Sequence, residues 1–231
     1  MEEMLLPGER AEILGKDKII IQSEDLYRFT SDAVALSRFV RIKSGDRLAD
    51  LCSGCGIVGL HALYLHGEIA SVTLFELQER LSDMARRTIE KNHEEKARAV
   101  CTKVQEIGSE YAGAFDVVTC NPPYFKVGAG DGKETESERL AKQEIAVTLR
   151  EIVCAAAKCL RFGGRFAVCY PVGRLVELVT ECRAAKIEPK RMKFLTKKEG
   201  GKPYLVLLEG TLGGKPGLIV ENTEVNQCST L

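Results

Sequence analysis

The four residues Asn121-Pro122-Pro123-Tyr124 carry the clearest chemical signal in the sequence. They follow a short apolar run, residues 115–120, which is typical of a buried strand. Because proline has a fixed φ and no N–H to give to a sheet, two prolines in succession turn the backbone out of the sheet at Asn121. The Asn121 amide oxygen and the adjacent carbonyls can accept the hydrogens of a planar –NH₂ group, and the Tyr124 ring can stack on the plane that carries it. The motif indicates a site for a planar amine, although an ordinary strand-ending turn with an aromatic residue has the same pattern.

A glycine-containing turn comes earlier in the chain, at Asp50-Leu51-Cys52-Ser53-Gly54-Cys55-Gly56, between an apolar run and a helical pattern. In open α/β sheets, ligands bind at the carboxyl ends of the strands. Gly54 and Gly56 allow the backbone to approach a ligand closely, and the N-terminus of the following helix favours an anionic group. Glu76 ends the next apolar run, where its carboxylate can accept hydrogen bonds from both hydroxyls of a ribose. The turn and the acid together predict a cofactor site.

Two other interpretations of this turn are weaker. Gly54-x-Gly56-x-x-Gly59 formally matches the dinucleotide fingerprint, with Glu76 at a suitable distance. However, the charge of Asp50 would repel a pyrophosphate, whereas a cationic sulfonium amino acid would tolerate this charge. A nicotinamide enzyme also has no need for Asn-Pro-Pro-Tyr.

Cys52-x-x-Cys55 has redox or metal-ligand spacing, yet no second pair completes a zinc set, so we predict no metal.

The composition is that of an ordinary globular protein: 231 residues, of which 45% are hydrophobic and 29% charged. No apolar stretch approaches the length that spans a bilayer, and the N-terminus lacks the layout of a signal peptide, so we expect a cytoplasmic protein with no membrane partner. The formal net charge is zero, which counts mildly against a nucleic-acid partner. Basic residues nevertheless crowd one C-terminal region and form a cluster, either a solvated surface or a phosphate-binding one: Arg183, Lys186, Lys190, Arg191, Lys193, Lys197, Lys198 and Lys202.

Apolar periodicity and turn residues predict the elements that position these groups. A hairpin is expected within residues 12–21. Strands are expected at 47–51, 71–75, 98–103, 115–120, 165–170, 189–195 and 204–209. Helices are expected at 33–40, 57–66, 81–93, 137–159 and 173–184, and a polar surface loop at 126–137. Alternating strands and helices predict an α/β fold with a mostly parallel sheet and helices on both faces, and the short connection between the last two strands requires them to pair antiparallel.

With both motifs considered, the chain resembles the class I S-adenosylmethionine-dependent methyltransferases that methylate amino groups, and in particular the tRNA1(Val) adenine methyltransferase family. The similarity covers nearly the whole chain, from about residue 12 to residue 221. The segments that carry it are Phe29–Leu36, Asp50–Gly56, Asn121–Phe125, Ala141–Glu144, Arg161–Gly164 and Leu207–Gly210. The glycine turn and Asn-Pro-Pro-Tyr are diagnostic of the chemistry and less so of the substrate, because DNA adenine methyltransferases and release-factor glutamine methyltransferases also carry Asn-Pro-Pro-Tyr.

The resemblance implies a Rossmann-like class I methyltransferase fold with a seven-stranded sheet, divided into an N-terminal hairpin arm (1–30), a methyltransferase domain (31–221) and a frayed tail (222–231). It also implies S-adenosyl-L-methionine (SAM) as cofactor and an RNA substrate, most readily tRNA. Cofactor binding is expected at Asp50, Ser53, Gly54, Gly56, Glu76 and Asn121, and catalysis at Asn121, Pro122, Pro123 and Tyr124. The segment around Phe29 and Asp32 is expected to cover the cofactor, although Asp32 is also a suitable helix cap.

Three departures from the family pattern stand out. Cys52 occupies the place of the first glycine of the turn, so the turn must accommodate a side chain there. Where the family carries an acid for the cofactor's adenine, this chain has the segment 103–106. Lys142-Gln143 replaces the middle of an Ala-Arg-His-Glu pattern. Among rival functions, methylation of a protein glutamine usually requires an additional helical N-terminal domain, and a non-catalytic RNA chaperone would have no need for an intact Asn-Pro-Pro-Tyr motif. The oligomeric state is not predicted.

Overall fold

The structure, a computed structural model, describes residues 5–15, 17–23, 26, 31–122 and 147–226. The strands are β1 (Glu9–Ile13), β2 (Ile19–Ser23), β3 (Arg47–Leu51), β4 (Ser71–Glu76), β5 (Ala97–Cys101), β6 (Phe115–Cys120), β7 (Leu160–Pro171), β8 (Ile187–Thr196), β9 (Pro203–Leu212), β10 (Ile219–Val220) and β11 (Glu224–Val225). The helices are α1 (Ser31–Phe39), α2 (Ile57–His66), α3 (Glu79–Lys91), α5 (Leu149–Cys159) and α6 (Leu175–Ala184), with short 3₁₀ turns η2 (Val104–Glu106), η3 (Ser109–Tyr111) and η4 (Val172–Arg174). Within the described ranges, no helix has the length and apolar character needed to cross a membrane.

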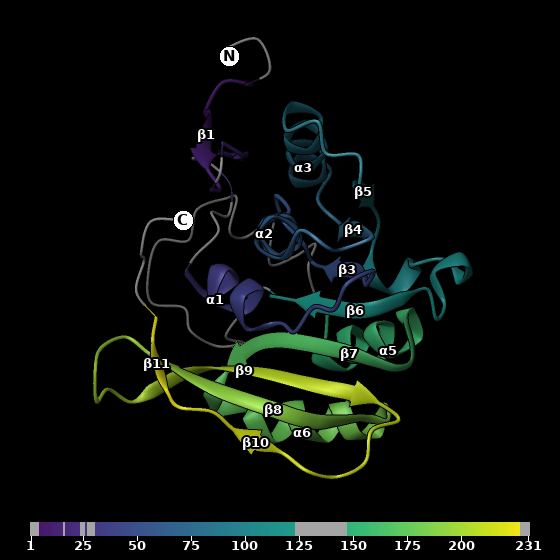
Figure 1. The fold of residues 1–231 in the computed structure, drawn as a ribbon, viewed down its shortest axis with the longest axis vertical. Coiled ribbons are helices and arrows are strands. Elements are labelled where there is room, and N and C mark those ends of the chain that lie inside the picture. Colours follow the sequence, from purple (N-terminus) through teal and green to yellow (C-terminus); the bar gives the residue numbers. More distant parts are fainter. Residues whose placement is uncertain (1–4, 16, 24–25, 27–30, 123–146, 227–231) are drawn as a thin grey trace.

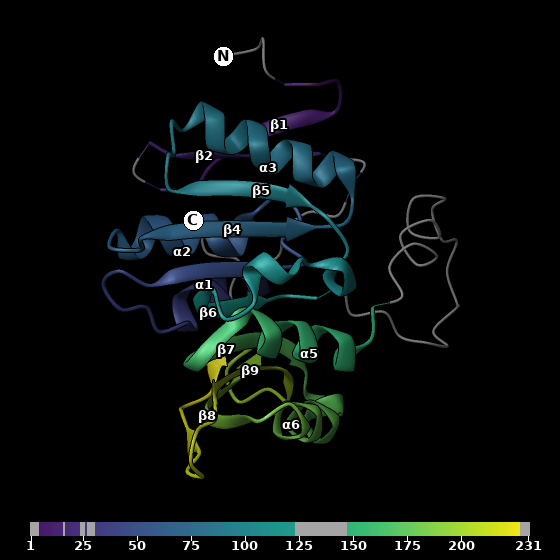
Figure 2. The same ribbon diagram turned by 90° about the vertical axis from the view of Figure 1, so that its right-hand side faces the viewer.

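One sheet organises the molecule, with the strand order β10-β8-β9-β7-β6-β3-β4-β5 and β11 beside β8 (Figure 1). The pairs β3–β4, β4–β5, β3–β6 and β6–β7 are parallel, while β9 runs antiparallel to both β7 and β8. Within this sheet, the path of the chain begins in the middle at β3 and moves outward through β4 to β5. It then returns to β6 on the other side of β3, as the succession of strands in Figure 2 shows. The predicted Rossmann-like fold is confirmed, although the sheet has nine strands in place of the expected seven, because β10 and β11 both add to β8. The point where the strand order reverses lies between β3 and β6.

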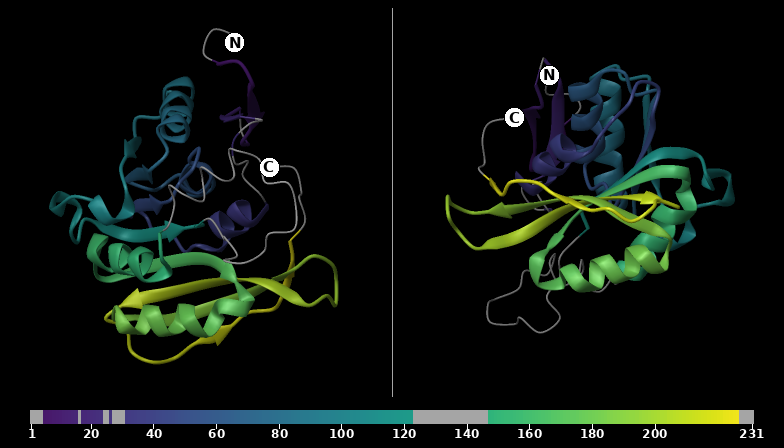
Figure 3. Two further views of the ribbon diagram at one scale, coloured as in Figure 1. Left: turned by 180° about the vertical axis from the view of Figure 1, so that it is seen from behind. Right: turned by 60° about the horizontal axis from the view of Figure 1, so that its bottom comes forward.

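Helices cover both faces of this sheet because the strand residues alternate between two apolar clusters. Leu48 and Val117 belong to the cluster that α1, α2 and α3 cover. Leu51 and Val118 belong to the cluster on the other face, which α5 and α6 cover. Figure 3 shows α5 and α6 side by side on that second face.

The predicted N-terminal hairpin forms from β1 and β2 and lies against α3 rather than in the main sheet. Polar side chains of α3 and of the residue after it satisfy the free edge of β2. The Asn92 side chain accepts a hydrogen bond from Ile19 N (3.0 Å) and donates one to Ile19 O (2.7 Å), and Thr88 Oγ1 accepts one from Ile21 N (3.0 Å). Arg87 forms an ion pair with the buried carboxylate of Glu9 at 2.6 Å, which attaches the first strand as well.

Three predictions differ most from the structure. The helix expected over 137–159 begins at Leu149, because Thr148 and Glu151 form a capping box there; residues 137–146 lie outside the described part. The strand expected at Arg165 already begins at Leu160, and Gly163-Gly164 lies in an irregularity inside it rather than before it, where the register with β6 shifts. In the segment expected to be frayed, Glu224–Val225 pairs with β8 as β11.

Close packing of α2 on β4 explains why glycine recurs in this helix and before it. A Cβ atom on Gly59 would lie 2.5 Å from Leu74 Cδ2 and 3.0 Å from Val72 Cγ1. Gly56 has φ 91°, a left-handed conformation, and a Cβ there would lie 2.7 Å from Leu74 Cδ1. The spacing that resembles a dinucleotide fingerprint therefore has a structural reason, which is the approach of the helix to the sheet.

We expect Gly59→Ala to lower the free energy of unfolding by about 1–3 kcal/mol, because the added methyl group must displace Leu74 or move α2. Urea unfolding measures the change. Gly173→Ala is the matched control, since a Cβ at that glycine meets no atom within 4 Å, and its stability should stay close to that of the unaltered protein. Equal stability of both variants would contradict the close packing of α2.

Candidate active site

The turn after β3 has the backbone conformation that the glycine pattern suggests. Cys52, Gly54 and Gly56 have φ values of 54°, 57° and 91°, all left-handed. The turn closes through a hydrogen bond from Gly56 N to Ser53 O (2.8 Å), and Ser53 N donates to Phe75 O in β4 (3.1 Å). Glycine would adopt the conformation of Cys52 without strain. For a residue with a Cβ, the left-handed conformation costs about 1–2 kcal/mol.

Glu76 connects the end of β4 to this turn. Its Oε2 accepts a hydrogen bond from Gly54 N (2.8 Å), and its Oε1 accepts one from Gln78 N (2.9 Å). Glu76 is 6% exposed, and burial raises the pKa of its carboxyl group against the effect of these hydrogen bonds. The Leu77 N–H is a further backbone donor to this carboxylate. A carboxylate has about four acceptor positions, and the remaining capacity is open to a ligand. The structure brings together Glu76 and Gly54, two residues that are predicted to bind the cofactor, at the ends of neighbouring strands.

Two features of the turn suit a bound polar molecule. Ser53 Oγ is buried and has no hydrogen-bond partner among the described residues. A Cβ atom at Gly54 would meet no atom within 4 Å, so the backbone of this residue borders open space. Buried hydroxyl groups normally have a hydrogen-bond partner, so an unpaired one beside uncovered backbone suggests that a ligand supplies the missing partner. The residues present therefore fit a cofactor with hydroxyl and charged groups.

Asp50 lies beneath the turn rather than on its surface. Its side chain is 0% exposed, Oδ1 accepts from Thr119 Oγ1 (2.7 Å), and Oδ2 accepts from Gly59 N (3.1 Å). Burial raises the pKa of Asp50 to about 7, against these two hydrogen bonds, and the nearby Glu76 carboxylate adds to the rise. Asp50 therefore joins β3, β6 and the first turn of α2, and sequence reasoning did not identify Thr119 or the Gly59 N–H as its partners.

The raised pKa of Asp50 predicts an unusual dependence of stability on pH. Between the ordinary aspartate pKa of 3.8 and the raised pKa of about 7, the folded protein holds a proton that the unfolded chain has released, so stability falls as pH rises through this window. Asp50→Asn cannot ionise, and its amide can accept from Gly59 N and donate to Thr119 Oγ1. We expect the stability of the variant relative to the unaltered protein to increase from pH 5 to pH 7 by up to about 1.4 kcal/mol per pH unit.

Urea unfolding at pH 5, 7 and 8 measures this difference. Asp116→Asn is the control: hydrogen bonds from Arg161 and Arg47 outweigh burial and lower the pKa of the Asp116 carboxyl group, so its charge is present throughout this range. The effect of that substitution should be independent of pH between 5 and 8. A flat profile for Asp50→Asn would show that Asp50 is ionised in the folded protein.

Asn121 and Pro122 directly follow β6, at the edge of the sheet where the glycine turn lies. Cys120, the last residue of β6, pairs with Leu51, the last residue of β3, so the two motifs leave neighbouring strands at the same level. Pro122 is buried and Asn121 half-buried. Pro123 and Tyr124, together with the polar loop at 126–137 and the segment 141–144, lie outside the described residues.

Other predicted residues have less direct places. In the segment 103–106, Lys103 and Glu106 form an exposed ion pair (3.3 Å), which does not single out one of them as an adenine ligand. Asp32 lies within the first turn of α1, and its Oδ1 accepts from Asn226 Nδ2 (2.9 Å), a bond between distant segments in place of the expected cap. Burial raises the pKa of the Cys55 thiol to about 12, and the described residues contain no group of three or more His, Cys, Asp or Glu that could hold a metal ion.

Several known proteins with related sequences carry a methyltransferase name. A tRNA1(Val) (adenine(37)-N6)-methyltransferase of Shewanella sp. (strain W3-18-1) is 24% identical over 188 residues, which cover 79% of this chain and 77% of the relative. A protein of the same name from Bacteroides thetaiotaomicron is 23% identical over 84% of this chain and 81% of the relative.

Solved structures share the fold at lower identity. A predicted O-methyltransferase from Agrobacterium tumefaciens superposes with a TM-score of 0.67 at 18% identity, covering 84% of this chain and 86% of the other. A geranyl diphosphate methyltransferase in complex with SAM superposes with a TM-score of 0.58 at 13% identity, covering 79% and 84%. The sequence profile of the methyltransferase small domain matches residues 31–172, more than half of the chain and both motifs, and the protein therefore belongs to this methyltransferase family.

Proposed function

We propose that this methyltransferase transfers a methyl group to the exocyclic amino group of an adenine in tRNA. The observation that carries the proposal is the position of Asn121 and Pro122 at the end of β6, which lies beside β3. The glycine turn follows β3, and Glu76 accepts a hydrogen bond from Gly54 N in this turn. The names of the curated relatives support tRNA as the substrate class. We further propose that residues 31–221 act as one catalytic domain with residues 1–30 as an arm, and that the protein works in the cytoplasm, where tRNA is modified.

S-adenosyl-L-methionine is the cofactor, and it supplies an electrophilic methyl carbon on a sulfonium. Three groups of the chain suit its binding: the unpaired Ser53 Oγ, the uncovered backbone at Gly54, and the Glu76 carboxylate, whose remaining lone pairs can accept ribose hydroxyls. Gly56 shapes the turn. Asp50 acts through the turn, because both of its oxygens are used by Thr119 and Gly59.

Asn121 and Pro122 are proposed to activate the amine. An exocyclic amino nitrogen is a poor nucleophile because its lone pair is delocalised into the ring. Hydrogen bonds from its two hydrogens to the Asn121 side-chain oxygen and the Pro122 carbonyl favour a tetrahedral nitrogen and localise the pair. Stacking on Tyr124, with Pro123 fixing the turn, would hold the flipped base at a gain of about 1–3 kcal/mol. A general base is not required, since the alkylated nitrogen is acidic and loses its proton readily.

The test is incubation of the protein with a labelled methyl donor and, separately, bulk tRNA, DNA or release factor, followed by digestion and identification of the modified unit. We expect label on the amino group of adenosine in tRNA. Label in DNA adenine or in a glutamine of the release factor would replace tRNA by one of the two alternative substrates. A lack of label in all three pools would overturn the proposed activity.

A further inference from the structure

The C-terminal basic cluster separates in three dimensions into groups with different surroundings. Several of its members are neutralised by neighbouring acids. Arg191 pairs with Glu209 (3.3 Å) and Glu221 (2.9 Å), and Lys193 pairs with Glu224 (2.9 Å). These pairs stabilise the edge of the sheet around β8, and their charges are already compensated. They are therefore poor candidates for contacts with an anionic partner.

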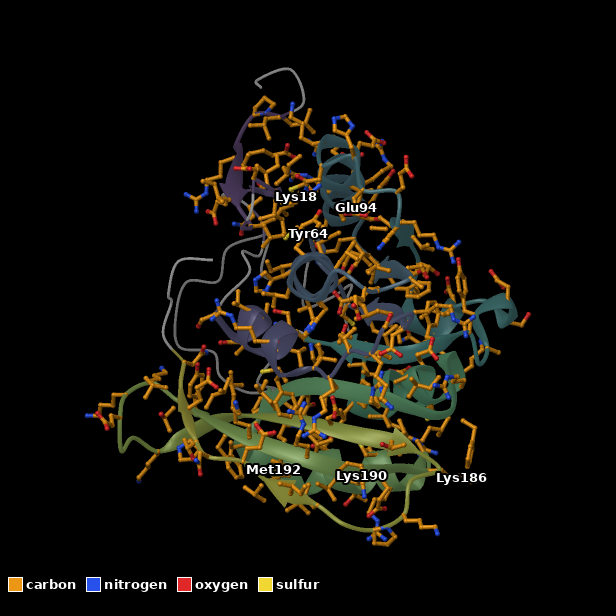
Figure 4. The ribbon with its side chains drawn as sticks, viewed as in Figure 1. Lys18, Tyr64, Glu94, Lys186, Lys190 and Met192 are labelled. Atoms are coloured by element: carbon orange, nitrogen blue, oxygen red, sulfur yellow. The ribbon has the colours of Figure 1, made fainter. Side chains whose placement is uncertain are left out.

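A second group lies at the end of β8 that is remote from the active site. Lys186 precedes β8 and Lys190 follows near its start, as Figure 4 shows. Ile187, at the start of β8, pairs with Leu212 at the end of β9. The neighbouring residue of β9, Thr211, pairs with Arg165 of β7. That region adjoins the beginning of β6, whereas Asn121 follows the end of β6. Lys186 and Lys190 thus face the amino edge of the sheet.

The third group occupies the connection between β8 and β9 at the opposite edge. Lys197, Lys198 and Lys202 lie in the turn 197–202, all three are exposed, and none is paired with an acid in the part of the chain that the structure describes. Leu195 pairs with Leu205 at the base of this turn, and Leu205 pairs with Pro171 at the carboxyl end of β7. The turn, at the left of Figure 1, therefore projects from the same edge of the sheet as the glycine turn and Asn121.

Hydrogen bonds fix the base of this turn to distant parts of the chain. The Asn226 side-chain amide donates to Tyr204 Oη (2.6 Å) and to Asp32 Oδ1 (2.9 Å), so β9, the segment after β11 and α1 meet at one point. Lys197 Nζ lies 5.5 Å from the centroid of the Tyr204 ring. The turn is therefore held in a defined position relative to the first turn of α1. A positively charged turn that is fixed next to the active-site edge can orient a bound polyanion as well as attract it.

We propose that the turn 197–202 binds the phosphate backbone of the RNA that presents its base to Asn121, through Lys197, Lys198 and Lys202. The inference rests on the proposed function and adds the surface that positions the substrate. Phosphate contacts set the orientation of a nucleic acid without reading its sequence. They also make binding dependent on salt, because each neutralised phosphate releases condensed counterions. Lys186 and Lys190, equally basic but at the other edge, take no part.

Two double variants with the same change in net charge test this proposal: Lys197→Gln with Lys198→Gln, and Lys186→Gln with Lys190→Gln. Binding of tRNA is measured by fluorescence anisotropy at a series of salt concentrations, and binding of SAM by calorimetry. For the first variant we expect at least tenfold weaker tRNA binding at low salt. The slope of log K against log salt should fall by about 0.7–0.9 for each lost contact. The second variant should bind tRNA like the unaltered protein, and both should bind SAM normally.

Each other outcome has a defined meaning. Equal weakening in both variants would show that net charge alone attracts the RNA, and no weakening in either would place its backbone elsewhere; both results overturn the inference. These results leave the proposed function intact if the unaltered protein still methylates tRNA. If the unaltered protein neither binds nor methylates tRNA, the proposed function fails, and the assignment of this turn fails with it.

Discussion

Replacement of Asn121 by alanine is expected to lower the rate of methyl transfer by about 1,000-fold, the upper range for loss of one preorganised polar group at a reacting centre. The substitution removes the side-chain acceptor proposed for one hydrogen of the amine, so the lone pair of the nitrogen stays delocalised. Asn121 is also expected to contact the cofactor, but Glu76 and Ser53 are unchanged, so the affinity for SAM should stay within a fewfold of its original value. Single-turnover experiments with labelled donor measure the chemical step separately from product release.

Asn121→Asp is the conservative companion of this variant, because a carboxylate keeps an acceptor oxygen at nearly the same position. It should retain more activity than Asn121→Ala. Calorimetry with SAM and an unfolding curve show whether either variant has lost its cofactor site or its fold. If Asn121→Ala transfers methyl groups at the original rate while it binds SAM normally, the amide is not the group that activates the amine.

Much of the fold could be predicted from local pattern. The bounds of β3, α2 and β6 agree with the prediction residue by residue, because each element combines a clear period with glycine or proline at its ends. β10 and β11 were missed, since two-residue strands carry no periodicity and form only where the chain happens to pass along β8. The start of α5 was within reach of the sequence, because Thr148-x-x-Glu151 is a recognisable capping box.

The placement of the predicted site residues could be predicted in outline, while their contacts could not. The meeting of Glu76 with the glycine turn follows from parallel strands that end at one edge. The burial of Asp50 also follows from strand geometry that the prediction did not use: Leu48 and Asp50 are two residues apart and face the same side, which α2 covers. The division of the basic cluster could not be predicted from proximity in sequence, because a ten-residue strand such as β8 separates its ends by about 30 Å.

Replacement of Glu76 by alanine is expected to weaken SAM binding by at least about 100-fold, because two hydrogen bonds to a charged group, each with a contribution of about 1.5–3 kcal/mol, are lost together. Calorimetry measures the dissociation constant directly. The tRNA affinity should be unaffected when no donor is present, since Glu76 is not among the residues proposed to contact the RNA backbone. An unchanged dissociation constant for SAM would exclude Glu76 from the cofactor site.

A large effect of Glu76→Ala has two possible origins, because the carboxylate also accepts the hydrogen bond from Gly54 N (2.8 Å) and thereby supports the turn. A cofactor analogue whose ribose lacks a hydroxyl separates them in a double-mutant cycle. If Glu76 binds the ribose, the unaltered protein should lose affinity for this analogue relative to SAM, and Glu76→Ala should show no further loss. If both proteins lose affinity by the same factor, Glu76 acts only by holding Gly54, and the ribose must bind to another group at this edge of the sheet.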